Sequence, residues 1–237
     1  MFPLRDRNPT RHTPFVTIAL IAANVAAWVF LQALGDARGL AESICSLGLI
    51  PGELLGLVDE GTQVPLGPGL SCVIGGESAW HTVVTSMFMH GGWFHIIGNM
   101  WFLWVFGDNI EEALGPFRFA LFYLVCGAAA AGAQVLANPD STVPMVGASG
   151  AIGGVMGAYA LLFPRAPIDT VLFFGFFFRV FQVPAVFMLG YWLLIQVLGG
   201  LPAFSGGGEG GGVAFWAHVG GFVAGVLLAY PMRARRR

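Results

Sequence analysis

A series of long apolar runs, separated by short polar stretches, constrains this chain more than any other feature. Only 10% of its 237 residues are charged, whereas soluble domains carry roughly 25% charged residues. A helix needs about 20 consecutive apolar residues to cross the hydrocarbon core of a bilayer. Because most of the runs approach that length, the chain is predicted to fold as a helical bundle inside a lipid membrane.

By this length rule we predict an all-α membrane protein with six transmembrane helices in a single domain, residues 1–237. Glycine, with 35 residues, is too frequent for ordinary soluble helices, but in membranes it lets helix backbones approach closely. The first segment is interpreted as an uncleaved anchor rather than a signal peptide, because further apolar segments follow it. The six predicted segments are 14–34, 93–114, 116–136, 149–163, 183–200 and 213–230.

Arginine placement predicts the orientation of these helices, since cytoplasmic loops carry an excess of Lys and Arg. The N-terminal segment 1–13 and the basic tail 231–237 are both rich in arginine, and six spans place them on one side. We therefore expect both termini in the cytoplasm. Loop 35–80 carries several acidic residues and Arg38 as its single arginine, so it is expected on the external side.

The two longest loops have distinct compositions. Loop 35–80 is rich in Gly and Pro, so turns with little helix are expected in it. Its Cys45 and Cys72 pair if the outside is oxidising, and two free thiols are an equally open alternative. The glycine-rich loop 201–212 is interpreted as a flexible tether rather than as a mobile cap beside a site.

A serine between small residues is the first candidate for chemistry, because polar residues inside spans are costly and mark functional sites. Ser149 lies between Gly147-Ala148 and Gly150, where the short segment 149–163 begins. A helix that begins below the membrane surface would place Ser149 within the bilayer, at the bottom of a wet cavity. The alternative is a packing seam with an incidental hydroxyl, and the tetrapeptide alone does not separate the two.

His218 in the last segment is the second candidate. Gly221 and Gly225 follow it on the same helix face, which can press against segment 149–163 and bring His218 close to Ser149. A serine is a weak nucleophile until a base takes its proton, and a neutral imidazole is such a base. A lone histidine that is hydrogen-bonded for packing is the structural alternative.

His95 and Asn99 form the third element, since their i, i+4 spacing in HGGWFHIIGN projects both from one helix face. Both can donate hydrogen bonds to a developing oxyanion, whereas the structural alternative is a pair of interhelical hydrogen bonds. No intramembrane Asp or Glu is placed to complete a triad, so a Ser–His dyad is predicted. The acidic residues of this segment lie at its cytoplasmic end, where we interpret them as a loop anchor: Asp108, Glu111 and Glu112.

A metal site is the rival interpretation of the histidines, and neither a metal nor a cofactor is expected. The chain has five His residues but no H-E-x-x-H sequence, so the helical zinc-protease pattern is absent. No run of basic residues alternates with aromatic residues, so no nucleic acid is expected as a partner.

The motifs HGGWFHIIGN, GASG and AHVGGFVAG, in this order over about residues 80–230, resemble the rhomboid family of intramembrane serine proteases. The resemblance implies that Ser149 is the nucleophile and His218 the general base. It also implies an oxyanion hole of His95, Asn99 and the Ser149 backbone N–H. The supporting positions that it implies are His90, Gly147, Gly150, Gly221 and Gly225.

The same resemblance implies an endopeptidase that hydrolyses peptide bonds in or near transmembrane segments of other membrane proteins. Its partners would be substrates with a transmembrane helix and the lipid bilayer itself, and a bacterial inner membrane is the expected location. The alternative is a catalytically weak or inactive relative that binds transmembrane helices without cutting them. Retention of both Ser149 and His218 favours the enzyme.

Two positions depart from the family pattern. Some members have an aromatic residue four positions after the serine, where it stacks on the histidine, and this chain has Gly153 there. His218 would then be held by tight packing or by another aromatic ring. In addition, loop 35–80 lacks the Trp-Arg pair of many members, which makes its structure less predictable without affecting the dyad.

Overall fold

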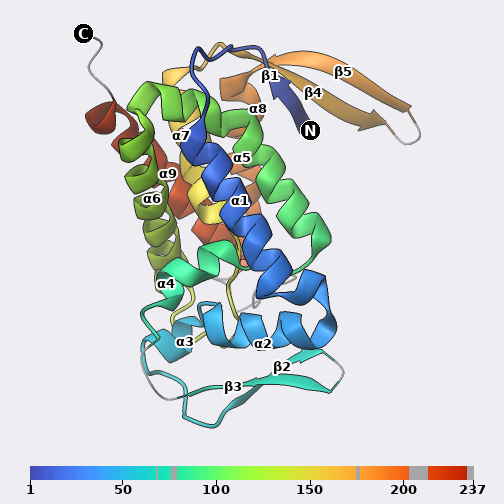
Figure 1. Cartoon of the computed structure of the whole chain (residues 1–237), viewed down its shortest axis with the longest axis vertical. Coiled ribbons are helices and arrows are strands. Elements are labelled where there is room, and N and C mark those ends of the chain that lie inside the picture. The colour runs from blue at the N-terminus through green and yellow to red at the C-terminus, as the bar shows by residue number, and fades with distance from the viewer. Residues whose placement is uncertain (68, 76–78, 175–176, 203–212, 234–237) are drawn as a thin grey trace.

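The computed structural model describes residues 1–67, 69–75, 79–174, 177–202 and 213–233. Within these ranges, six helices of 14 residues or more form a bundle, and each lies on one of the predicted apolar segments (Figure 1). They are α1 (Phe15–Phe30), α5 (Trp93–Leu114), α6 (Pro116–Ala137), α7 (Ser149–Leu162), α8 (Ala185–Gly200) and α9 (Phe215–Met232).

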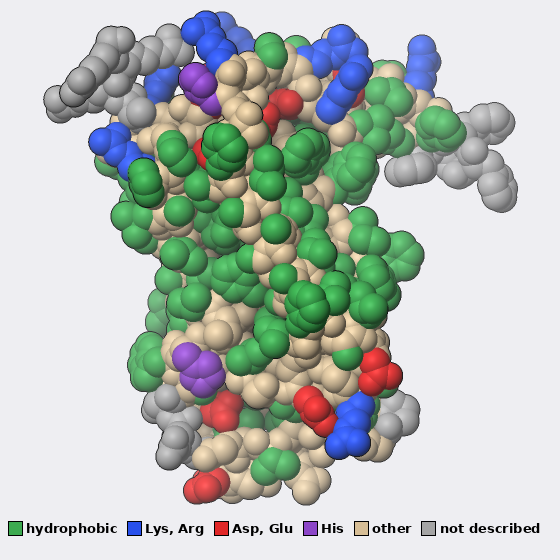
Figure 2. All heavy atoms as spheres, in the orientation of Figure 1, with side chains coloured by type: hydrophobic (Ala, Val, Ile, Leu, Met, Phe, Trp, Pro, Cys, Tyr) green, Lys and Arg blue, Asp and Glu red, His purple; other side chains and the backbone are tan. Residues whose placement is uncertain are grey.

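Apolar side chains cover the middle of the bundle on the face that Figure 2 shows, and the charged side chains gather at its two ends. By length and composition, α6 and α9 are each able to cross a membrane. The helices α1, α7 and α8 are apolar but shorter, with 16, 14 and 16 residues. Crossing of the bilayer by all six helices therefore stays a prediction.

The junction of α5 and α6 shows how the sequence sets helix boundaries. Gly115 ends α5 with a φ of 82°, which side chains with a Cβ rarely adopt, and Pro116 follows at the start of α6. One turn earlier, the Glu111 carboxylate accepts hydrogen bonds of 2.9 and 2.8 Å from the N–H groups of Val16 and Thr17. Glu111 thereby supplies acceptors to the free N–H groups at the start of α1.

Two further acidic side chains of α5 hold the segment that precedes α1. Thr10 Oγ1 donates a hydrogen bond of 3.2 Å to Asp108, and the Arg11 N–H donates one of 2.6 Å to Glu112. The predicted loop anchor therefore binds the N-terminal segment to the end of α5.

Helix α7 occupies the centre of the bundle, where it packs against α5, α6, α8 and α9. Its residues from Gly150 to Tyr159 are all buried. A Cβ on Gly221 of α9 would overlap the carbonyl oxygen of Gly150, and a Cβ on Gly225 would overlap that of Gly154. Glycine at these positions therefore lets the backbones of α7 and α9 touch.

Two antiparallel sheets lie outside the bundle, so the all-α prediction is wrong for these segments. At the end where the N-terminus lies, β1 (Phe2–Asp6), β4 (Pro167–Phe174) and β5 (Phe177–Pro184) pair in the order β1-β4-β5 (Figure 1). At the opposite end, β2 (Gln63–Gly67) pairs with β3 (Leu70–Val73). Aromatic and β-branched residues favour strands, and β4 and β5 are rich in both.

Loop 35–80 contains more helix than the sequence predicted. Asp36 begins α2 (Ala37–Leu47) by accepting hydrogen bonds from the N–H groups of Arg38 and Gly39, and α3 (Pro51–Leu54) follows. A disulfide joins Cys45 to Cys72, which decides between the two alternatives for these residues. The remaining short helices are η1 (Ala33–Gly35), α4 (Thr82–Thr85) and η2 (Ser86–Phe88).

Most of the glycine-rich loop 201–212 and the last four residues of the basic tail lie outside the described residues. The prediction of a flexible tether is therefore not addressed. At the other end of the chain, segment 1–13 is in part a sheet strand, since β1 pairs with β4.

Candidate active site

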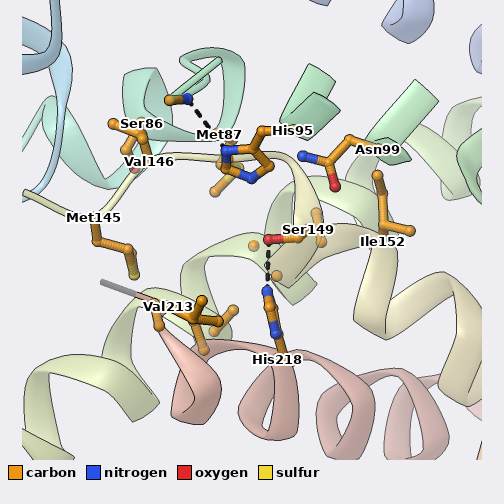
Figure 3. A pocket seen from close by; sticks show the side chains of 18 of the residues that line it. Ser86, Met87, His95, Asn99, Met145, Val146, Ser149, Ile152, Val213 and His218 are labelled. Atoms are coloured by element: carbon orange, nitrogen blue, oxygen red, sulfur yellow. Dashed lines mark hydrogen bonds between the residues drawn. The ribbon is translucent and has the colours of Figure 1, made fainter. Parts of the chain in front are cut away.

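The serine and the histidine singled out in the sequence meet inside the bundle. Ser149 is the first residue of α7, and His218 lies in the first turn of α9. Ser149 Oγ lies 2.7 Å from His218 Nε2, which is hydrogen-bonding distance (Figure 3). This is the geometry in which an imidazole can take the proton of a serine hydroxyl.

Close contact between α7 and α9 brings these two residues together. A Cβ on Gly153, one helical turn after Ser149, would lie 3.0 Å from the His218 carbonyl oxygen. Gly150 is equally confined, since a Cβ there would lie 2.6 Å from the Cβ of Ala130. An aromatic side chain at Gly153 would therefore not fit this arrangement.

The aromatic neighbour of His218 comes instead from α8. The ring of Trp192 lies 5.6 Å from the imidazole, centroid to centroid, with an interplanar angle of 40°. One helical turn later on α8, Gln196 Oε1 lies 2.7 Å from His218 Nδ1. Gln196 was not predicted from the sequence, where only a carboxylate was considered as a further partner of the histidine, although Gln196 is the single glutamine in the apolar segment 183–200.

His95 of α5 presents one ring nitrogen to the site. Its Nδ1 accepts a hydrogen bond of 3.2 Å from the Gly91 N–H, so the proton of the neutral ring lies on Nε2. Gly147 lies between this nitrogen and the serine: a Cβ there would be 2.7 Å from His95 Nε2 and 3.3 Å from Ser149 Oγ. The absence of a side chain at Gly147 keeps that space open, and its φ of 132° also favours glycine.

Asn99, one turn after His95, adds a second donor. Its side chain is buried, and its amide nitrogen has no hydrogen-bond partner among the residues that the structure describes. Figure 3 shows Ser149 with His218 on one side and with His95 and Asn99 on the other. The Ser149 N–H, at the start of α7, is one of the helix N–H groups that lack an acceptor within the helix.

His90 supports this arrangement from outside the cavity. It is fully buried, and its ring meets the ring of His95 edge to face at a centroid distance of 5.1 Å. The Gln32 side chain accepts a hydrogen bond of 2.8 Å from the His90 N–H and donates one of 2.7 Å to its carbonyl oxygen. This pair of bonds ties the chain ahead of α5 to the end of α1.

These side chains line a cavity of about 540 Å³. Its polar groups are few and converge on Ser149, whereas the rest of its wall is mostly apolar, as in many ligand sites. Ile44 of α2 and Leu66 of β2 contribute to the wall, so the cavity faces the end of the bundle that carries loop 35–80. The fold and site together define a class: an apolar helical bundle that encloses a serine–histidine pair and unpaired donors.

Comparison with known proteins identifies the family. The rhomboid domain matches residues 77–235 of this chain. Rhomboid-like protein 11, chloroplastic, of Arabidopsis thaliana is 31% identical over 159 residues, which cover 64% of this chain and 52% of that protein. Rhomboid protein 1, mitochondrial, of Saccharomyces cerevisiae is 33% identical over 155 residues, which cover 63% and 41%.

A shorter match joins the chain to a bacterial protein. Rhomboid protease GluP of Bacillus subtilis is 35% identical over 82 residues, which are 35% of this chain and 16% of that protein. The chain spans about half the length of the first two relatives. Because the domain match covers more than half of the sequence, the chain belongs to the rhomboid family, and it is an integral membrane protein.

Proposed function

We propose that the chain is an intramembrane serine endopeptidase that hydrolyses peptide bonds in or near the transmembrane segments of other membrane proteins. The observation that carries this proposal is the 2.7 Å contact between Ser149 Oγ and His218 Nε2 inside a buried, mostly apolar cavity. The name of one relative, a rhomboid protease, supports the same activity.

The acylation step follows from the positions of the four polar side chains. Ser149 Oγ attacks the carbonyl carbon of the scissile bond while His218 Nε2 takes its proton. The carbonyl electron pair moves to the oxygen, whose negative charge accepts hydrogen bonds from His95 Nε2, Asn99 Nδ2 and the Ser149 N–H. The C–N bond then breaks, and the imidazolium gives its proton to the leaving amine.

Deacylation uses the same groups in reverse order. Water attacks the acyl ester of Ser149 while His218 Nε2 takes a proton from it. The second tetrahedral intermediate expels Ser149 Oγ, which recovers a proton from the imidazolium. The products are a new carboxyl terminus and a new amino terminus, and the enzyme returns to its starting state.

We place both termini in the cytoplasm and the cavity mouth on the external side. The described arginines lie at the end of the bundle that carries β1, apart from Arg38, and the positive-inside rule assigns that end to the cytoplasm. Helix α7 has 14 residues. It is therefore about 21 Å long against a hydrocarbon core of about 30 Å. A helix this short supports a position for Ser149 below the external surface.

We propose a bacterial inner membrane as the location. The Bacillus subtilis relative supports it. The use of arginine and no lysine in this chain is typical of proteins from GC-rich bacterial genomes and supports it as well. Two relatives are named chloroplastic and mitochondrial, so an organelle membrane is the alternative location. Fractionation of cells that carry the native gene distinguishes an inner membrane from the other locations.

The proposed function is tested in liposomes that contain the purified protein and a set of single-span membrane proteins with small residues near the outer end of the span. Mass spectrometry maps any new termini. We expect the wild-type protein to cut within or near the span, and Ser149→Ala to remain folded and cut nothing. Binding of these proteins without cutting would favour the helix-binding alternative, and cutting by Ser149→Ala would exclude Ser149 as the nucleophile.

A further inference from the structure

A second pair of hydrogen bonds continues from the Ser149–His218 contact into α8. Gln196 Oε1 lies 2.7 Å from His218 Nδ1, and Gln196 Nε2 donates a hydrogen bond of 3.3 Å to the Trp192 carbonyl oxygen. The second bond decides which end of the amide faces the histidine, because only its nitrogen can donate to a carbonyl. The oxygen of Gln196 therefore faces His218.

The orientation of the amide fixes the protonation of the imidazole. A carbonyl oxygen accepts but cannot donate, so His218 Nδ1 carries the hydrogen in the neutral ring. His218 Nε2 then has its lone pair free toward Ser149 Oγ. This is the one neutral tautomer in which His218 can take the proton of the serine.

We propose that Gln196 is a positioning residue for the reaction: it selects the reactive tautomer of His218 and holds the ring toward Ser149. The inference rests on the proposed function, since it assigns Gln196 a role in that same chemistry. Gln196 touches neither the serine nor the cavity, so it acts through His218. Its amide dipole also stabilises the imidazolium that forms when Ser149 loses its proton.

The surroundings explain why an amide suits this position. Gln196 is 7% exposed and lies among apolar residues of α8. A neutral amide accepts the hydrogen bond of the imidazole without placing a charge among these residues in the resting protein. The helix also supplies Trp192, whose ring lies 5.6 Å from the imidazole, so two residues of α8, four positions apart, contact His218.

Few ionisable side chains lie near His218, so the pH dependence of the reaction can report on the Gln196–His218 contact. Ser149 faces it from α7, Gln196 from α8 and His95 from α5. Among the residues that line the cavity, His95 is the one other side chain with an acidic or basic group. Substitutions at Gln196 leave His95 unchanged, so a difference between profiles belongs to the Gln196–His218 contact.

The test compares three variants with the wild-type protein on a single-span protein that the wild type cuts. Gln196→Leu removes the acceptor at similar volume, and Gln196→Glu keeps an acceptor while adding a charge. Leu198→Ala is the matched control, because Leu198 is a largely exposed residue of the same helix, away from the cavity. Each preparation is titrated with a fluorophosphonate, so that kcat is expressed per active site, and its Tm is measured.

We expect Gln196→Leu to lower kcat roughly 10- to 100-fold with KM unchanged, because about 90% or more of its neutral imidazoles then adopt an unreactive tautomer or tilt. Gln196→Glu is expected to recover part of kcat. It should also move the acidic limb of the kcat/KM profile about one pH unit upward, because a carboxylate favours the imidazolium. Leu198→Ala should match the wild type in kcat and in pH profile.

Two results would overturn the inference while leaving the proposed function intact. One is a kcat per active site for Gln196→Leu within about twofold of wild type, even if its Tm falls. The other, which decides the matter if Gln196→Leu does not fold, is an acidic limb in Gln196→Glu that coincides with that of the wild type. A wild-type protein that neither binds the fluorophosphonate nor cuts would instead overturn the proposed function.

Discussion

Asn99 lines the cavity that holds Ser149, and none of the described residues accepts a hydrogen bond from its buried amide nitrogen. A donor left without an acceptor in the resting protein is available for a charge that appears during the reaction. We predict that Asn99→Ala lowers kcat about 10²-fold with little change in KM, since the lost hydrogen bond forms in the transition state. Kinetics on a membrane substrate measure the effect.

The matched control for this substitution is Asn24→Ala. Asn24 is a buried asparagine of α1 whose amide donates to the Leu20 carbonyl oxygen, away from the cavity. The control should keep a kcat close to wild type. If Asn99→Ala also keeps it, the role of Asn99 is packing between helices and the oxyanion is held by other donors.

At this scale the sequence predicted that Ser149 and His218 meet, but not which residues of α8 contact His218. Ser149, His218, His95 and Asn99 are conspicuous because each is polar within or beside an apolar segment. Gln196 is equally polar, yet its role depends on the rotation of α8, which periodicity in a uniformly apolar helix does not reveal. For the same reason, the sequence did not reveal that the aromatic neighbour of His218 comes from α8, in place of a side chain at Gly153.

Among the elements, the contact between α7 and α9 carries the geometry of the site. Gly221 faces the backbone carbonyl of Gly150. A backbone atom cannot rotate away from an added Cβ as the end of a flexible side chain can. We predict that Gly221→Ala lowers the free energy of unfolding by about 2 to 3 kcal/mol and abolishes fluorophosphonate labelling, because α9 must move away from α7. Thermal unfolding in detergent measures the first effect.

Gly132→Ala provides the comparison, since a Cβ at this position of α6 meets no atom within 4 Å. The control should be neutral or stabilising by up to about 1 kcal/mol, because alanine is the better helix former. Equal Tm values and equal labelling for the two variants would mean that the close approach of α7 and α9 is not required.

The strand β1 is attached to the bundle by charged and polar contacts. Asp169 of β4 pairs with the guanidinium groups of Arg7 and Arg5 at 2.9 and 2.8 Å, and these partners lower its pKa. Asp6, at the end of β1, accepts hydrogen bonds of 2.6 Å from the Tyr159 hydroxyl and 2.8 Å from the Asn109 amide. Burial raises the pKa of Asp6 from 3.8 to about 6, and the nearby Asp108 contributes.

This shift predicts a pH dependence of stability. The folded protein holds the Asp6 proton more tightly than the unfolded chain does, so the free energy of unfolding falls as the pH rises from about 4 to about 6. Asp6→Asn imitates the protonated form and should flatten this part of the profile, which Tm measurements across the range record. Parallel profiles for the two proteins would contradict a role for Asp6 in this pH dependence.

The helices of the bundle could be predicted from the sequence, whereas the strands could not. Long apolar runs favour membrane helices, and a helix lies on each of the six predicted segments. The aromatic run of β4 and β5 is equally apolar, and β4 also pairs with β1 from the distant N-terminus. In loop 35–80, the capping residue Asp36 marks the start of α2. The high content of Gly and Pro in this loop nevertheless favoured a prediction of turns.

On the scale of the whole molecule, an apolar middle separates two polar ends on the face that Figure 2 shows. Ile44 and Leu66 of loop 35–80 line the cavity together with residues of the bundle. The disulfide between Cys45 and Cys72 ties α2 to β3 at the end that carries this loop. Under the proposed function, this end faces the external side, and substrates reach the site from within the membrane. Composition predicted an apolar helical bundle, whereas the contact between Ser149 and His218 is seen only in the folded structure.

The most direct test of the central claim is fluorophosphonate labelling of the purified, folded protein, with Ser149→Ala and His218→Ala beside it. A fluorophosphonate reacts with a serine whose proton is taken by a neighbouring base. We predict that the wild-type protein is labelled and that neither variant is. Wild-type protein that is folded but unlabelled, or Ser149→Ala protein that still labels, would contradict it.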